Sequence, residues 1–310
     1  MEKVKIGLPK ALLFYKYGEL WVNFFENLGF DIIISPNTNL EILENGKKFT
    51  EDEACLSLKI YMGHVHYLLD KCDYILVPRI ACLKHNEKMC TNFNALYDLV
   101  RNTFKKRIIN YNIDVDKKED EFYAFTTMGL DLGFRYREVV KAYHQAKKME
   151  TISIDRRISK QQVELANSKK IKVLLAGHPY NLHDDLIGKV IQKLLEENQV
   201  DIIMSDLYRG KYLDQEANKI SKRNYWTYSR EILGAITHYQ ENVDGIILIT
   251  TFPCGPDSLT NEMILRTVRN KPMIQLIIDE ATGEAGLATR IESFVDILKE
   301  RSIENETTSH

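Results

Sequence analysis

Long apolar runs are absent from this chain of 310 residues. No stretch approaches the roughly 20 apolar residues that a membrane-spanning helix needs. The segment Met1–Gly7 also lacks the apolar centre and the small-residue cleavage site of a signal peptide. We therefore expect a cytoplasmic protein with no membrane as a partner.

A strong charge of either sign is absent too. The net charge is −2, which gives the chain no general electrostatic attraction to nucleic acid, and we expect no nucleic-acid partner. The glycine-rich loops that hold phosphates, G-x-x-x-x-G-K-S/T and G-x-G-x-x-G after a strand, are missing. The chain itself is therefore not expected to bind ATP or a dinucleotide by a standard route.

Cysteine is scarce, with five residues in the chain. Because thiols stay reduced in the cytoplasm, we do not expect structural disulfides. The five thiols are then either small buried apolar groups or ligands and catalysts. Their spacing matches neither the C-x-x-C pair of a zinc knuckle nor the tight cysteine run of a bacterial ferredoxin.

Short β-branched runs recur along the chain, and each is followed by a segment with helical periodicity. The predicted strands are Val4–Leu8, Asp31–Ser35, Tyr74–Pro78, Arg107–Tyr111, Lys172–Ala176, Asp201–Ser205, Gly245–Thr250 and Met273–Ile278. The predicted helices are Ala11–Leu28, Leu40–Glu44, Glu53–Leu69, Ala95–Asn102, Asp185–Glu197, Trp226–Tyr239, Ser258–Arg269 and Leu287–Glu300. Strands that alternate with helices are typical of parallel sheets with right-handed crossovers.

The fold class that this pattern predicts is α/β, with two doubly wound parallel-sheet domains of the Rossmann or flavodoxin-like type. Residues 1–118 form the predicted N-terminal domain and residues 169–303 the C-terminal domain. Residues 119–168 are charge-rich and helical in period, and we predict a helical insert and connector there. In doubly wound sheets, function resides in the loops at the carboxyl ends of the strands.

Two of the cysteines stand where a predicted strand or loop gives way to a helix. Cys254 follows the strand Gly245–Thr250 in a turn rich in proline and glycine, and Asp257 or Ser258 is expected to cap the next helix. Cys55 lies after three acidic residues, near a predicted helix start. A thiol close to a helix N-terminus has a lowered pKa, although a buried thiol in the core remains the alternative for both.

The strand Tyr74–Pro78 has a cysteine before it and two after it. Cys72 precedes this strand and is interpreted as structural. Cys82 and Cys90 are expected in the loop that follows it. Thiolates far apart in sequence converge if each lies at the same rim of the two sheets, and thiolate ligands without histidine or carboxylate favour iron–sulfur or zinc.

A histidine and a tyrosine follow the first strand of the second half. His178 and Tyr180, in Gly-His-Pro-Tyr-Asn, lie at a strand's carboxyl end and are candidates for proton delivery or for hydrogen bonds to a substrate or a cluster sulfur. A well-satisfied loop histidine is the alternative. These loops together suggest a functional cleft between the domains.

Several of these segments resemble proteins related to the 2-hydroxyacyl-CoA dehydratase activases. The resemblance runs from about Lys3 to Leu298. Its most specific segments are Lys5-Ile-Gly-Leu-Pro-Lys-Ala-Leu-Leu-Phe-Tyr-Lys-Tyr, Asp52-Glu-Ala-Cys-Leu, Gly63-His-Val, Asp73-Tyr-Ile-Leu-Val-Pro-Arg, Gly177-His-Pro-Tyr-Asn, Tyr225-Trp-Thr-Tyr, Phe252-Pro-Cys-Gly-Pro-Asp-Ser and Ile278-Asp-Glu-Ala-Thr-Gly-Glu-Ala-Gly.

The resemblance implies an iron–sulfur protein. The wider superfamily contains 2-hydroxyacyl-CoA dehydratase subunits, benzoyl-CoA reductase subunits and double-cubane cluster proteins, whose members hold one cubane with three cysteines per subunit. By position these cysteines are Cys55, Cys90 and Cys254, and the cofactor is a 4Fe–4S cluster or a bridged double cubane in the cleft between the domains. The resemblance also implies a separate activator ATPase of the actin-like fold, which supplies electrons, and a homodimer or a related subunit.

Two positions depart from the family. Thr91 stands where relatives usually carry proline, and Cys82 stands where they typically carry serine. Cys82 is either a fourth ligand or a neutral replacement for that serine. Three protein ligands leave one iron open to a substrate, whereas four close the site.

Three functions follow from these observations. The first is a redox enzyme component that accepts low-potential electrons and reduces or dehydrates a small molecule or acyl-CoA. The second is a non-catalytic cluster or scaffold protein that partners or regulates the activator. The third is a zinc-containing or metal-free protein that binds a CoA-like ligand.

Overall fold

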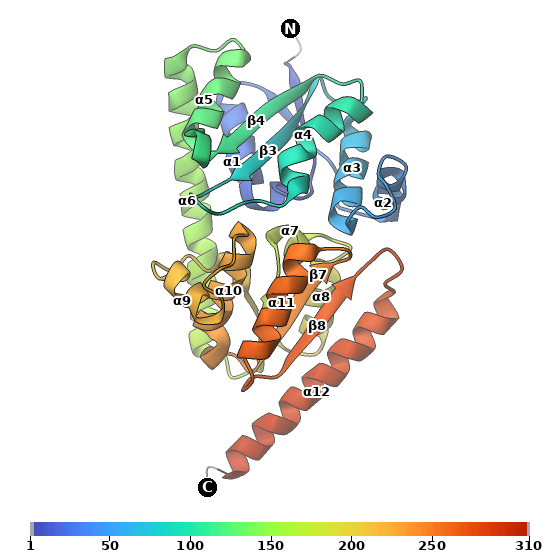
Figure 1. The fold of residues 1–310 in the computed structure, drawn as a ribbon, viewed down its shortest axis with the longest axis vertical. Coiled ribbons are helices and arrows are strands. Elements are labelled where there is room, and N and C mark those ends of the chain that lie inside the picture. The colour runs from blue at the N-terminus through green and yellow to red at the C-terminus, as the bar shows by residue number, and fades with distance from the viewer. Residues whose placement is uncertain (1–2, 309–310) are drawn as a thin grey trace. The chain divides into compact units, whose positions relative to one another are not determined.

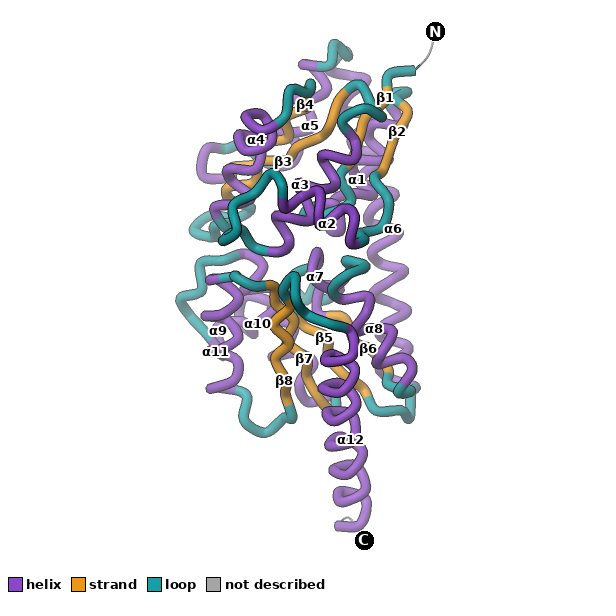
Figure 2. The backbone as a smooth tube through the Cα atoms, turned by 90° about the vertical axis from the view of Figure 1, so that its right-hand side faces the viewer, coloured by secondary structure: helices purple, strands orange, loops and turns teal. Residues whose placement is uncertain are grey.

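The computed structural model describes residues 3–308, which form two compact units (Figures 1 and 2). The first unit ends at Asp155 and includes Tyr225–Thr227, and the second holds Arg156–Asn224 and continues from Tyr228. The boundary between them falls inside the long helix α6 (Tyr136–Asn167). The stretch predicted as a helical insert contains α5 (Glu121–Asp131) and α6.

The first unit contains a parallel sheet of four strands in the order β2-β1-β3-β4. Its strands are β1 (Lys5–Leu8), β2 (Asp31–Ile34), β3 (Tyr74–Cys82) and β4 (Ile108–Asp114). Its other elements are α1 (Phe14–Asn27), α2 (Leu40–Lys47), α3 (Leu56–Leu68), α4 (Thr91–Thr103) and the 3-10 turn η1 (Val115–Lys117), with α5 and the part of α6 up to Asp155.

Aromatic side chains build much of the core of this unit. Trp21 of α1 meets Tyr111 of β4 edge to face at 5.5 Å between ring centroids, and Phe24 of α1 meets Phe125 of α5 at 4.6 Å. All four side chains are buried. Edge-to-face pairs of this kind stabilise a core beyond the area that they bury. Helices α1 and α5 therefore share one face of the sheet.

The second unit repeats the arrangement with the strand order β6-β5-β7-β8. Its strands are β5 (Lys172–Ala176), β6 (Asp201–Met204), β7 (Gly245–Thr251) and β8 (Met273–Ile278). Its helices are α7 (Pro179–His183), α8 (Gly188–Glu197), α9 (Leu213–Ile220), α10 (Thr227–Tyr239), α11 (Gly255–Thr267) and α12 (Glu284–Thr308), with 3-10 turns η2 (Ser205–Leu207) and η3 (Gln240–Asn242). Figure 2 shows β5 to β8 side by side in this unit.

The predicted fold class is confirmed, since each unit is a parallel sheet flanked by helices. Every predicted strand is present with bounds that shift by a few residues. Among residues 3–308, no helix combines the length and the apolarity needed to cross a bilayer.

The predicted end of the third strand was wrong. The sequence predicts Pro78 as its last residue, but β3 continues to Cys82, so Cys82 lies on a strand and not in the following loop. Proline is excluded from the middle of a sheet because it cannot donate a ladder hydrogen bond. Here β1 pairs with β3 only at Tyr74 and Ile75, so Pro78 has a hydrogen-bonded neighbour on one side alone, in β4.

Two predicted helix starts were also wrong. Helix α4 begins at Thr91 instead of Ala95, and α11 begins at Gly255, ahead of the two residues expected to cap it. Neither start carries the Ser, Asp or Asn cap that marks a helix in sequence, because the capping position is a cysteine in both. Helix α7 was not predicted, since five residues are too short to show a period.

Two glycines allow α2 to approach α3 closely. A methyl group on Gly46 would lie 1.8 Å from the carbonyl oxygen of Lys59, and one on Gly63 would lie 1.9 Å from that of Ile42. Such distances are far inside van der Waals contact, so only glycine permits this backbone approach. The position of α3, the helix that begins after Cys55, depends on it.

We expect Gly63→Ala to destabilise the first unit by about 1–3 kcal/mol, the usual cost of overpacking a core. Urea unfolding of the variant and the wild type measures the change. Gly286→Ala is the control, because no atom lies within 4 Å of the added methyl group on α12. A Gly63→Ala protein as stable as the wild type would show that the two helices separate without cost.

Candidate functional site

The strand order places a topological switch point in each sheet. In the first unit β1 lies between β2 and β3, and in the second unit β5 lies between β6 and β7. The connection after β1 therefore leads to one side of the sheet and the connection after its neighbour β3 leads to the other, as do those after β5 and β7. In doubly wound sheets, ligands bind in the crevice that opens at the carboxyl ends of these two strands.

Two of the cysteines occupy equivalent positions at these switch points. Cys90 lies between β3 and α4, and Cys254 lies between β7 and α11. Each residue has extended backbone angles and is the N-cap of a helix of 13 residues. The two units thus present a cysteine at the same place in the same topology.

The third cysteine also precedes a helix. Cys55 is the N-cap residue of α3, with φ −64° and ψ 148°. Asn92, in the first turn of α4, donates a hydrogen bond from Nδ2 to Cys55 Sγ at 3.6 Å. The N-termini of α3 and α4 are therefore neighbours, which brings Cys55 and Cys90 together in the first unit.

Helix N-termini favour the thiolate form of cysteine. The first backbone N–H groups of a helix have no partner within it and carry the positive end of its dipole. A thiolate beside them is stabilised electrostatically, and the thiolate is the form that binds metals. Cys55, Cys90 and Cys254 are each partly exposed, so their sulfurs combine this environment with access.

The chain just before Cys90 is held by backbone hydrogen bonds. The N–H of Met89 donates to the carbonyl of Ala81 at 3.0 Å, and the N–H of Lys88 donates to that of Tyr225 at 2.7 Å. The N–H of Thr227 returns a bond to the carbonyl of Lys88 at 3.2 Å. Residues 225–227 pack with the first unit and fix the segment that leads to Cys90.

A polar network lies behind Cys254. The Asp257 carboxylate, in the first turn of α11, has Oδ1 2.7 Å from Nε2 of His178 and accepts a hydrogen bond on Oδ2 from Thr250 at 2.8 Å. Nδ1 of His178 contacts the hydroxyl of Tyr180. All four side chains are buried, so their charges and dipoles act on one another with little screening by water.

The Asp257 carboxylate remains ionised in this network. Burial by itself would raise the pKa of Asp257, but attraction to His178 and hydrogen bonds from His178, Thr250 and Cys254 more than offset it. The pKa therefore lies below its ordinary value. The network connects Cys254 to the two residues predicted from the loop after β5.

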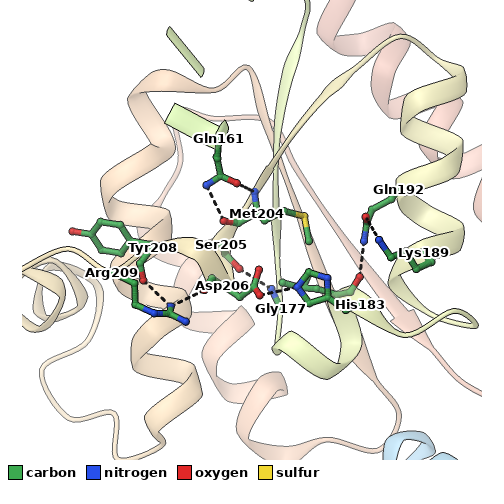
Figure 3. Close-up of polar contacts among 11 residues, drawn as sticks. Gln161, Gly177, His183, Lys189, Gln192, Met204, Ser205, Asp206, Tyr208 and Arg209 are labelled. Atoms are coloured by element: carbon green, nitrogen blue, oxygen red, sulfur yellow. Dashed lines mark hydrogen bonds and ion pairs between the residues drawn. The ribbon is translucent and has the colours of Figure 1, made fainter. Parts of the chain in front are cut away.

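A second histidine–aspartate pair lies near the carboxyl ends of β5 and β6 (Figure 3). Nε2 of His183, at the end of α7, is 2.7 Å from Oδ2 of Asp206, which follows β6. Burial raises the pKa of Asp206, but the His183 charge and hydrogen bond more than offset this and hold it below its usual range. Ser205 Oγ accepts a hydrogen bond from the N–H of Gly177 at 3.4 Å. This bond and the His183–Asp206 pair both link the loop after β5 to the loop after β6.

The remaining two cysteines are buried and lie elsewhere in the first unit. Cys72 donates from Sγ to the carbonyl of Leu68 at 3.2 Å, and Cys82 donates to that of Lys84 at 2.9 Å. Burial raises the pKa of both thiols. Neither is a helix N-cap. The five cysteines, all within the described residues, form no disulfide.

The structure brings some of the predicted residues together and adds others. It joins Cys55 to the start of the helix that Cys90 caps, and His178 to Tyr180. Sequence reasoning assigned Asp257 to a helix cap and overlooked Asn92. The position of Asp257, three residues after Cys254, could have indicated its contact with another element. An aspartate inside the first helical turn, unlike one at the N-cap, does not have to accept hydrogen bonds from its own helix.

Comparison with known proteins identifies the family. Residues 5–207 match the family described as the CoA enzyme activase uncharacterised domain (DUF2229). The chain belongs to this family. The match spans the first unit up to Asp155 and continues through β5, α7 and β6. The resemblance to activase-related proteins is thereby confirmed in this coarser form. No curated protein matches the chain.

The match has a clear relation to the site. It covers Cys55 and Cys90 together with His178 and Tyr180, while Cys254 lies beyond its end. The activase-like domain thus includes both neighbouring cysteines of the first unit and the loop after β5. Cys254 and its carboxylate partner are contributed by the C-terminal part of the chain.

We expect Asp257→Asn to destabilise the second unit by about 3 kcal/mol near pH 6, because it leaves His178 buried without its negative partner. A carboxyl whose folded pKa is depressed stabilises the fold above its ordinary pKa of about 4, and this contribution is lost as pH falls through the folded pKa. The difference between variant and wild type should therefore shrink below about pH 4.

Urea unfolding as a function of pH measures this difference. Asp296→Asn is the matched control, because Asp296 is 70% exposed and its ion pair with Lys299 spans 3.6 Å at the surface. Such pairs contribute under about 1 kcal/mol. A destabilisation by Asp257→Asn that stays constant down to pH 3 would mean that the lost charge is not its cause.

Proposed function

We propose that this protein binds an iron–sulfur cluster through Cys55, Cys90 and Cys254. The observation that carries the proposal is that each of the three is the N-cap residue of a helix of 13 residues. The two buried cysteines are not. Three thiols in thiolate-favouring positions form a soft donor set, and soft thiolate ligands select iron–sulfur clusters or zinc.

The donor set fits a cluster better than a single zinc ion. Structural zinc sites have four protein ligands, commonly with short local spacings between them. Three thiolates from three separate helix starts leave a fourth position open, as the superfamily resemblance implies for a cubane. Asn92 would serve as an outer hydrogen-bond donor to Cys55, and such donors raise the reduction potential of a cluster.

We further propose that the protein belongs functionally to the 2-hydroxyacyl-CoA dehydratase-like superfamily. A bound cluster supplies one-electron chemistry at low potential. Such a potential requires an energetic donor, and a separate ATP-hydrolysing activator is the partner that the activase-like domain favours. The electron would pass to a small molecule or an acyl-CoA, and a homodimer or a related subunit would complete the assembly.

The loop after β5 would supply protons in such a reaction. With Nε2 of His178 facing the Asp257 carboxylate, a neutral ring carries its proton there and accepts the Tyr180 hydroxyl proton on Nδ1. The carboxylate orients the ring and fixes this tautomer. Reduction of a carbonyl or an alkene needs protons as well as electrons, which is the proposed role of this pair.

An electron-carrying or scaffolding partner of an activator is the second candidate function. It is favoured by the family description, which connects the domain with CoA enzyme activases and not with a substrate-converting enzyme. The two functions share the cluster and differ in turnover. Consumption of an acyl-CoA in the presence of activator, ATP and reductant supports the first, and reduction of the protein without consumption supports the second.

We expect Cys55→Ala, Cys90→Ala and Cys254→Ala each to lower the bound iron of anaerobically prepared protein by about half or more, because a cubane tolerates few ligand losses. Cys72→Ala is the control, since it removes a buried thiol that is bonded to a backbone carbonyl. Iron analysis and circular dichroism together separate cluster loss from misfolding. Full iron loading of a folded Cys254→Ala protein would contradict the ligand assignment.

A further inference from the structure

A group of metal-binding side chains lies at the ends of β3 and β4, in the first unit. These strands are parallel, and Cys82, the last residue of β3, pairs in register with Asp114, the last residue of β4. Asp116 follows two residues later on η1. One ligand atom of each residue, a thiol sulfur and two carboxylate oxygens, lies within 4.8 Å of the other two.

The group is closed on one side and open on the other. Cys82 is fully buried, whereas the Asp116 side chain is 35% exposed. The His85 ring lies at the surface, with Nδ1 2.9 Å from Oδ1 of Asp116. An ion entering from solvent would therefore meet an imidazole and a carboxylate first and a thiol at the bottom.

One carboxylate oxygen of the group lacks a partner. Oδ2 of Asp114 is 3.0 Å from Nζ of Lys117, but Oδ1 is buried and has no hydrogen-bond donor within the described part of the chain. A buried carboxylate oxygen without a partner costs free energy, and a cation coordinated there would remove that cost.

We propose that Cys82, Asp114 and Asp116 form a site for one divalent transition-metal ion of the zinc class, with His85 as the fourth ligand. Thiolate, imidazole and carboxylate are the donors that zinc and cobalt accept together, whereas calcium and magnesium take oxygen ligands alone. The site shares no ligand with Cys55, Cys90 and Cys254. It therefore does not rest on the proposed cluster.

Binding requires a small rearrangement and the release of one proton. Metal–ligand bonds of about 2.0–2.3 Å place ligand atoms of a tetrahedral site about 3.5 Å apart, so the side chains close inward by about 1 Å. The Cys82 thiol loses its proton to solvent as the metal–sulfur bond forms, and its hydrogen bond to the carbonyl of Lys84 is given up. Lys88, now in contact with Asp116 and 52% exposed, swings out into water.

The site would clamp the segment that leads to Cys90. It ties the end of β3 to the end of β4 at the point where the loop of residues 83–89 begins. That loop returns to hydrogen-bond at Ala81, one residue before Cys82. A metal at Cys82 would restrict the loop at its start as the Met89–Ala81 hydrogen bond does at its end.

Titration of the metal-free protein with Co²⁺ tests the proposal, because thiolate-bound cobalt has an intense charge-transfer absorption. We expect part of the wild-type absorption to depend on Cys82 and to be lost in Cys82→Ser. In Asp114→Asn, this part should need at least about 10-fold more cobalt to develop. Cys72→Ser, which alters a buried thiol elsewhere in the unit, should leave the titration unchanged.

Cys55, Cys90 and Cys254 can also bind cobalt, so the same titration is repeated with Cys90→Ala protein. The component that depends on Cys82 must persist there. Asp116→Asn is a second variant, and it should also weaken cobalt binding. Because Asp116 lies at the exposed rim, its replacement does not disturb a buried position. An unchanged titration in folded Cys82→Ser or Asp116→Asn protein, or loss of the Cys82-dependent component with Cys90, would overturn the proposal. Iron and sulfide content reports separately on the cluster.

Discussion

The positive end of a helix dipole lies beside a cysteine at three places in this structure. Cys55, Cys90 and Cys254 each take the N-cap position that serine, threonine, aspartate or asparagine usually fills. A thiol caps a helix poorly, so these positions give up local stability. The same N–H groups favour a thiolate, and the arrangement makes sense if the sulfurs bind an electrophile such as a metal.

The folds of the two units explain how these helix starts are presented. Each sheet has the same strand order, so the helix after its third strand begins at the topological switch point. In the first unit, close packing of α2 and α3 through glycine positions the start of α3, where Asn92 reaches Cys55. In the second unit, Asp257 connects the helix that Cys254 caps to His178 on the central loop. Sequence positions far apart thus contribute to sites that local spacing does not reveal.

Much of the fold could be predicted from the sequence, because buried parallel strands are continuous apolar runs and all eight were found as such. The errors lie where tertiary context overrides a local rule. Pro78 ended the predicted strand, but β1 has already separated from β3 there and no ladder bond is lost. Cysteine caps hid the starts of α4 and α11, since no propensity marks a cysteine as a helix start.

The candidate site could be predicted in part. Resemblance and loop position point to Cys55, Cys90 and Cys254, whose role as ligands stays a prediction. The network behind Cys254 depends on a contact between His178 and Asp257, 79 residues apart in sequence, which no pattern in one sequence indicates. Cys82 illustrates the same limit. Its proposed role as a metal ligand depends on the strand register that places it beside Asp114. Because the sequence predicts Cys82 in a loop, it does not indicate that Asp114 is its neighbour.

The decisive measurement of cluster binding is the content of iron and acid-labile sulfide in protein made and kept without oxygen, read with the resonance spectrum of the reduced protein. We expect iron and sulfide in near-equal amounts, about four of each per chain for a cubane, and a paramagnetic signal after reduction. A folded protein prepared in this way that contains zinc alone, or iron without sulfide, would contradict cluster binding.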